Sequence, residues 1–172
     1  MATPQVVRIL GFDPGSRRTG FGVIELSSGG KLAYVASGSI VLGALAFNDR
    51  LRRLYTTAST LVREHAPDEI SIERVFMHRN ADSALKLGHA RATLICATFA
   101  DEVPVFEYAA REVKQMVTGS GGAAKSQVAH MVCRLLGVQG ELGADAADAL
   151  AIAICHANCR NRPTLGAAAG QP

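Results

Sequence analysis

The chain has 172 residues, of which 48% are hydrophobic, and its formal net charge is +3. This length suits one domain with a complete core, and the sequence has no run of about 18 apolar residues that would predict a membrane span. The mildly basic charge permits a nucleic-acid partner without requiring one. Residues 1–7 lack the charged segment and apolar stretch of a signal peptide, so we expect a cytosolic protein with no membrane contact.

The first 42 residues predict three strands joined by short turns in an antiparallel meander. An apolar run leads into Asp13, the pair Pro14-Gly15 breaks the chain, and a second apolar run begins at Thr19. Asp13 therefore lies where the first strand leaves the sheet. Its carboxylate either bonds its own backbone in an Asx turn or is held in place to bind a cation.

Two helices are predicted in the next part of the chain. Residues 47–65 have amphipathic spacing, with Asn48 or Asp49 as the N-cap. Residues 80–100 form a longer helix that is apolar over most of its girth, so we expect it to be buried on more than one side. The second buried side belongs either to the core of this domain or to a partner subunit.

Between these helices, residues 68–76 predict a short strand that carries Glu73 near its end. A strand that follows a crossover helix lies parallel to an earlier strand of the same sheet. The carboxyl end of this strand should therefore lie beside the end of the first strand, and Glu73 should come close to Asp13.

The second half of the chain predicts one strand and three helices. The segments are an edge strand at 103–108, a helix at 109–118, a glycine-rich turn at 119–122, a helix at 125–136 and a nearly all-apolar helix from 144 to 155. Asp145 and Asp148 lie on one face of the first turn of that last helix. We expect a single domain over residues 1–160 and a mobile tail over 161–172.

The cysteines suggest structural thiols. Cys96, Cys133, Cys155 and Cys159 all fall in predicted helices and form no C-x-x-C pair, so we expect small buried thiols. A zinc site built from Cys155, His156 and Cys159 would lack a second ligand cluster.

Four acids in otherwise apolar surroundings carry the functional argument: Asp13, Glu73, Asp145 and Asp148. Burying a carboxylate is costly unless it is paired or binds a cation, and these acids have no obvious basic partner in the sequence. Capping and the helix dipole account well for one acid at the start of a helix, but less well for both Asp145 and Asp148 on one face of it. Oxygen ligands at fixed spacing suit Mg²⁺ or Mn²⁺, and two such ions can promote phosphodiester hydrolysis.

Other chemistries have weaker support in the sequence. It contains no serine-histidine-aspartate set and no nucleotide-binding glycine loop. The turn after Asp13 is similar to the first phosphate loop of actin-like and sugar-kinase ATPases, but those proteins carry two such domains in a much longer chain. Nucleotide binding would support that alternative.

The sequence closely resembles the RuvC family of Holliday junction resolvases. The matching stretches run in order along the chain: Gly11–Ser16, Ile72–Met77, Asn80–Gly88, Phe106–Arg111, Val113–Gln115, Lys125–Gln127 and Asp145–Leu150. The resemblance covers about residues 6 to 158, and the whole series is far more specific than the Asp13 turn alone.

This resemblance implies an α/β, RNase H-like fold with a mixed five-stranded sheet flanked by helices. It implies a bacterial, cytoplasmic, metal-dependent endodeoxyribonuclease that nicks opposite strands of a four-way DNA junction in homologous recombination and DNA repair. The expected cofactor is Mg²⁺, two ions per active site, with Mn²⁺ able to substitute. The expected partners are the junction, a second copy in a homodimer and a branch-migration motor complex.

The resemblance also assigns roles to residues. Four carboxylates match the metal-binding and catalytic acids of the family one by one: Asp13, Glu73, Asp145 and Asp148. Lys114 and Lys125 match basic residues that act near the scissile phosphate, whereas without the resemblance they would be interpreted as solvated surface lysines. Phe76 matches an aromatic residue that unstacks junction bases, although core packing would equally explain it, and Arg74, two residues before it, is expected to contact DNA.

A two-fold dimer would present two equivalent sites to a junction with approximate two-fold symmetry, which makes the wide helix at 80–100 a candidate interface. Two alternatives remain open. A related RNase H-like nuclease that processes RNA would carry similar acids but would not be expected to have the 80–88 block or the lysine pair. A non-catalytic junction-binding protein would bind without metal and never cut.

Overall fold

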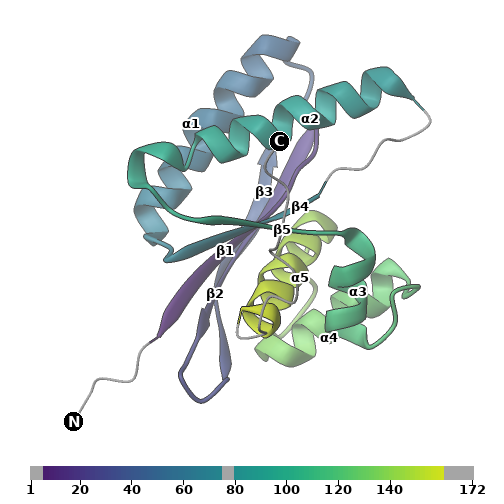
Figure 1. Cartoon of the computed structure of the whole chain (residues 1–172). Helices are drawn as coiled ribbons and strands as arrows, with labels where there is room; N and C mark the ends of the chain where they lie inside the picture. Colours follow the sequence, from purple (N-terminus) through teal and green to yellow (C-terminus); the bar gives the residue numbers. More distant parts are fainter. Residues whose placement is uncertain (1–5, 75–79, 161–172) are drawn as a thin grey trace, which may run out of the picture.

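The computed structural model describes residues 6–74 and 80–160, and these form a single mixed sheet with helices on both faces (Figure 1). The elements are β1 (Val7–Asp13), β2 (Arg18–Leu26), β3 (Leu32–Val41), α1 (Phe47–His65), β4 (Glu69–Glu73), α2 (Ala81–Cys96), a 3₁₀ turn (Phe99–Asp101), β5 (Val105–Tyr108), α3 (Ala110–Thr118), α4 (Lys125–Leu136) and α5 (Ala144–Cys159).

The strand order is β3-β2-β1-β4-β5. Strands β1 to β3 form the predicted antiparallel meander, while β4 pairs parallel with both β1 and β5. The predicted mixed five-stranded sheet flanked by helices is thus confirmed. Strand β5 lies at the edge, as expected for a strand preceded by Pro104, which has no backbone N–H to donate.

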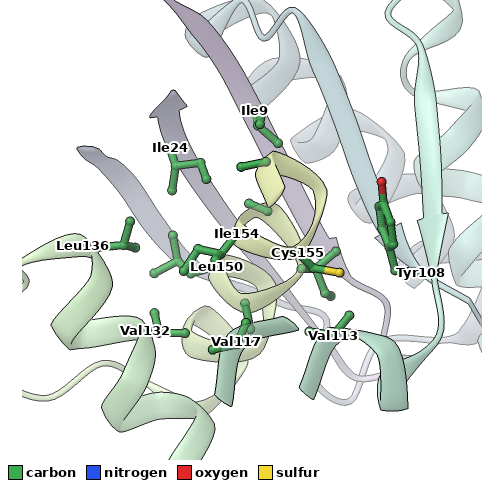
Figure 2. Close-up of a cluster of buried hydrophobic side chains, with 14 of the residues drawn as sticks. Ile9, Ile24, Tyr108, Val113, Val117, Val132, Leu136, Leu150, Ile154 and Cys155 are labelled. Carbon is green, nitrogen blue, oxygen red and sulfur yellow. The ribbon is translucent and has the colours of Figure 1, made fainter. Parts of the chain in front are cut away.

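The sheet separates two hydrophobic cores. Helices α1 and α2 cover one face, where Leu54 and Leu94 pack with Leu10 of β1. Helices α3, α4 and α5 cover the other face, where Ile9 meets the apolar side chains of α5 (Figure 2). Because successive side chains of a strand point to opposite faces, β1 supplies both cores and is buried on both sides.

Helix α5 lies directly on the backbone of the sheet, because two strand positions beneath it are glycine. A Cβ atom on Gly11 would lie 2.3 Å from the carbonyl oxygen of Ala149, and one on Gly20 would lie 1.9 Å from that of Asp145. Neither distance is sterically allowed, so the helix can approach β1 and β2 this closely only over glycine.

Several local predictions need correction. Asn48 and Asp49 do not cap α1, whose N-cap is Ala46, because both residues lie inside its first turn. The helix predicted over 80–100 ends at Cys96, where the chain tightens towards the 3₁₀ turn. Asn80 caps it by accepting a hydrogen bond from the backbone of Ser83.

Helix α2 is also less buried within this chain than its composition predicts. Its only buried residues are Ala90 and Leu94, while the side chain of Leu85 is 64% exposed. The expectation of buried thiols holds only for Cys155. Cys133 and Cys159 are partly exposed, and Cys96 is exposed because it lies on the outer side of α2. No helix within residues 6–74 and 80–160 is long and apolar enough to cross a membrane.

Candidate active site

The two strand-end acids meet as the topology predicts. Asp13 is the last residue of β1 and Glu73 is the last residue of β4. The strands are parallel, with Phe12 opposite Ile72, so the acids that follow leave the sheet side by side. Both line a cavity of about 200 Å³ at this end of the sheet.

Helix α5 and the two helices before it complete this cavity. Its lining consists of Asp13, Glu73, Ala110, Val113, Lys114, Lys125, Val128, Asp148 and Ala151. Three of the four predicted acids and both predicted lysines therefore come together, although they belong to five different elements. The elements converge here because α5 begins where β1 and β4 end.

Asp145, the fourth acid, lies beside the cavity rather than in its lining. The Ser39 hydroxyl of β3 donates a hydrogen bond of 2.9 Å to Asp145 Oδ2, and the guanidinium of Arg18 is 3.9 Å from the same oxygen. The charge of the Asp145 carboxylate still contributes to raising the pKa of Asp13. Ser39 and Arg18 were not predicted from the sequence, since nothing in the spacing relates them to residue 145.

The Asp13 carboxyl is the most perturbed acid of this group. Burial, followed by the negative charges of Glu73 and Asp148, raises its pKa from 3.8 to about 7, while the charge of Lys125 acts in the opposite direction. The site therefore carries more negative charge than the nearby lysine neutralises. This excess is what a bound cation would relieve.

Lys125 corrects the expectation that the acids have no basic partner. Its ammonium donates to Asp148 Oδ2 at 2.6 Å, and this hydrogen bond raises the pKa of Lys125. The pair forms because the first turn of α4 packs beside that of α5, a contact between residues 23 positions apart that no local pattern encodes. The lysine side chain is 78% exposed, so the ion pair is readily exchanged for another partner.

The donor atoms fit a hard divalent ion in their chemistry. They are carboxylate oxygens, the ligands that Mg²⁺ and Mn²⁺ prefer, and their charges are only partly compensated. As the side chains lie, no group of three or more His, Cys, Asp or Glu residues within the described part of the chain encloses a metal position. In the zinc alternative His156 would be a ligand, but both of its ring nitrogens are within hydrogen-bond distance of other groups, Tyr108 and Glu69.

The turn that follows Asp13 is held by a residue that sequence reasoning missed. The fully buried Thr19 hydroxyl accepts a hydrogen bond from the Gly15 amide at 3.3 Å and donates one to the Gly15 carbonyl at 3.1 Å. A threonine four residues after a Pro-Gly turn could have signalled such a closure. Arg74 is exposed directly after β4, and Phe76 lies outside the described residues.

Comparison with known proteins identifies the same family by a family model and by individual relatives. The family model described as "Crossover junction endodeoxyribonuclease RuvC" matches residues 9–156. The chain is 52% identical to the Methylococcus capsulatus protein of that name over 155 residues, 90% of this chain and 93% of the relative. It is 53% identical to the Vibrio cholerae protein over 163 residues, 95% of this chain and 92% of the relative.

Solved structures agree with this. The structure described as "T. thermophilus RuvC in complex with Holliday junction substrate" matches with a TM-score of 0.82 and 31% identity, covering 88% of this chain and 93% of that one. The yeast mitochondrial Holliday junction resolvase matches with a TM-score of 0.62 and 15% identity over 88% of this chain and 79% of that one, a likeness of fold alone. The predicted RNase H-like fold is confirmed.

We predict that Thr19→Val lowers the free energy of unfolding by about 1–3 kcal/mol, because it removes both hydrogen bonds of the turn while keeping the side-chain shape. Ser71→Ala is the matched control: that hydroxyl is also fully buried, but it has no hydrogen-bond partner among the described residues. Its removal should cost less than about 0.5 kcal/mol. Urea unfolding of both variants measures the difference, and equal losses would contradict the assignment.

Proposed function

Because the chain belongs to the RuvC family of crossover junction endodeoxyribonucleases, we propose that it resolves four-way DNA junctions by paired nicks on opposite strands. The observation that carries the proposal is the cavity in which Asp13, Glu73 and Asp148 gather with Lys114 and Lys125. Carboxylates that can hold metal, beside cations that can bind phosphate, are the groups that phosphodiester hydrolysis requires. The reaction would serve homologous recombination and DNA repair.

In this proposal the four acids, Asp145 included, hold two Mg²⁺ ions, and Mn²⁺ could replace them. When bound, such ions supply an activated water and stabilise the leaving oxygen. The contribution of the protein is placement, because Asp13 and Glu73 stand on the ends of adjacent parallel strands. The Ser39 hydroxyl would leave one oxygen of Asp145 available by bonding the other.

Lys114 and Lys125 would neutralise the scissile phosphate as point charges. The raised pKa of Lys125 keeps its ammonium charged at neutral pH. Since its pairing with Asp148 is largely exposed, the ammonium could pass from that carboxylate to a phosphate oxygen when DNA enters. Lys114 lines the same cavity from α3.

Other parts of the proposal rest on the resemblance alone. Phe76 would unstack junction bases, Arg74 would contact the DNA backbone, and a branch-migration motor would deliver the junction. Residues 1–160 would act as one nuclease domain, with the tail at 161–172 outside it.

A homodimer would bring two such sites to one junction. The support lies in α2 and the turn that follows it, where Leu85 is 64% exposed and Phe99 is 65% exposed. Part of the apolar surface of α2 is therefore not buried within this chain, and a second copy would cover it.

We predict that sedimentation at micromolar concentration gives the mass of a dimer. Leu85→Glu should shift the protein towards the monomer, because it would bury a charge at the interface. Leu135→Glu serves as the control, since Leu135 is also exposed but belongs to α4 on the other face of the sheet. A monomeric mass for the unaltered protein would exclude the dimer.

We predict that Asp13→Asn slows Mg²⁺-dependent junction cleavage about a thousandfold, because a metal ligand supplies several kcal/mol of transition-state stabilisation. Junction binding, measured in EDTA, should change less than about twofold, since most affinity for nucleic acid comes from phosphate contacts. Asp49→Asn is the control, because it makes the same charge change at an exposed position of α1.

Labelled four-way junction, linear duplex and RNA–DNA hybrid serve as the substrates. Paired nicks restricted to the junction and dependent on Mg²⁺ are the expected result. Binding without cutting on several junction sequences would favour an architectural protein, and cutting of the hybrid would favour an RNA-processing nuclease.

A further inference from the structure

Four polar side chains, none of which lines the cavity, form a continuous chain of hydrogen bonds between β5, α5 and β4. The Tyr108 hydroxyl is 2.6 Å from His156 Nδ1, and His156 Nε2 is 2.6 Å from Glu69 Oε2. Arg160 donates to both oxygens of Glu69, at 2.9 and 2.7 Å. Figure 2 shows the Tyr108 ring extending from the end of β5 beside α5. The proposed function assigns no role to this network.

The chemistry of the groups fixes the direction of each bond. The Glu69 carboxylate can only accept, so His156 Nε2 carries the proton, and Nδ1 is left to accept from the Tyr108 hydroxyl. Burial lowers the pKa of His156 below 6.5, although the carboxylate opposes this, and the hydrogen bond from Arg160 holds the pKa of Glu69 below 4.5. At neutral pH the imidazole is neutral, with Nε2 donating to Glu69 and Nδ1 accepting from Tyr108.

The network joins β4 and α5, two of the three elements that carry active-site acids, at the ends away from those acids. On β4, Glu69 lies four residues before Glu73, a rise of about 13 Å in a strand. On α5, His156 lies eight residues after Asp148, a rise of about 12 Å in a helix. Strand β4 and helix α5 run in opposite directions, and these two rises are nearly equal. The bond between Glu69 and His156 at one end therefore brings Asp148 level with Glu73 in the lining of the cavity at the other end.

Packing and hydrogen bonding act on this alignment at different strands. Where α5 crosses β1, Ala149 and Ala153 lie over Gly11, and where it crosses β2 the Leu150 side chain lies over Gly22. These contacts are made with β1 and β2, whereas the network provides directional bonds between α5 and β4. The acids at the first turn of α5 also repel Asp13, which favours displacement of that turn. Directional bonds at the far end would oppose this displacement.

We propose that Glu69, His156 and Arg160 are positioning residues that fix the axial register of α5 on β4 and thereby set the separation of Asp148 from Glu73. His156 is the central member, since it is 1% exposed and bonded on both ring nitrogens. The proposal rests on the proposed function in one respect, because the separation matters for catalysis only if these acids hold the metal.

The test compares His156→Phe with His156→Gln. Phenylalanine keeps the ring that stacks on Phe106 but removes both hydrogen bonds, while glutamine can still donate to Glu69 and accept from Tyr108. For His156→Phe we expect about tenfold weaker Mn²⁺ binding by electron paramagnetic resonance, the order of loss seen when groups that orient metal ligands are removed. Amide hydrogen exchange should be faster over residues 147–151, and His156→Gln should stay within twofold of the unaltered protein in both measurements.

Leu54→Ala is the control for general destabilisation, because Leu54 is fully buried in α1 on the opposite face of the sheet. It should lower the melting temperature and leave Mn²⁺ affinity unchanged, and any faster amide exchange should extend across the whole core rather than be confined to residues 147–151. Arg160→Gln covers the case in which His156→Phe does not fold. It removes the ion pair at a partly exposed position and should weaken Mn²⁺ binding about threefold, less than the tenfold expected for His156→Phe because the hydrogen bonds of His156 remain.

The proposal is overturned if His156→Phe leaves both Mn²⁺ affinity and exchange unchanged, or if Leu54→Ala weakens Mn²⁺ binding equally. If His156→Phe does not fold, unchanged Mn²⁺ binding in Arg160→Gln overturns it. Failure of the proposed function is distinguishable, because the unaltered protein would then bind no Mn²⁺ and cut no junction. In that case faster exchange over residues 147–151 in His156→Phe would still support the register role, and unchanged exchange would overturn it.

Discussion

The close seating of α5 on the sheet is the contact from which the site follows. Helix backbone meets strand backbone at Gly11 and Gly20, and any side chain at either position would lift the helix away. Because α5 lies this low, its first turn stands beside the ends of β1 and β4, and Asp148 shares a cavity with Asp13 and Glu73. The same approach buries the apolar length of α5 between the sheet and helices α3 and α4 (Figure 2).

This seating has an electrostatic cost that points to function. The raised pKa of Asp13 means that its ionised form is disfavoured in the folded protein, so stability falls as the pH rises from 3.8 to about 7. Lys125 offsets part of the charge through Asp148, and Ser39 and Arg18 hold Asp145. A fold that retains such a cluster is less stable than one with an amide in place of an acid, as is common where a site serves catalysis.

Local pattern was sufficient to predict the antiparallel meander, a parallel strand after the first helix and the convergence of Asp13 with Glu73, because short turns and crossover connections restrict strand direction. The mixed five-stranded sheet as a whole was implied by the family resemblance. Local pattern was also sufficient to place Asp145 and Asp148 near the start of the last helix, since two charged residues are conspicuous in an otherwise apolar segment. It could not give the contacts that depend on packing in three dimensions. The hydroxyls of Thr19 and Ser39, the Lys125–Asp148 pair and the Glu69–His156 bond each join elements whose separation along the chain carries no periodic signal.

The most direct test of the account is thermal unfolding of the unaltered protein and Asp13→Asn at pH 8, in EDTA and in Mg²⁺. In EDTA the variant should be the more stable by about 2 kcal/mol, because it lacks the cost of a buried carboxylate among like charges. Mg²⁺ should stabilise the unaltered protein and leave the variant nearly unchanged. A variant that is less stable in EDTA, or that gains as much stability from Mg²⁺, would contradict the claim that these acids are gathered to hold a metal ion.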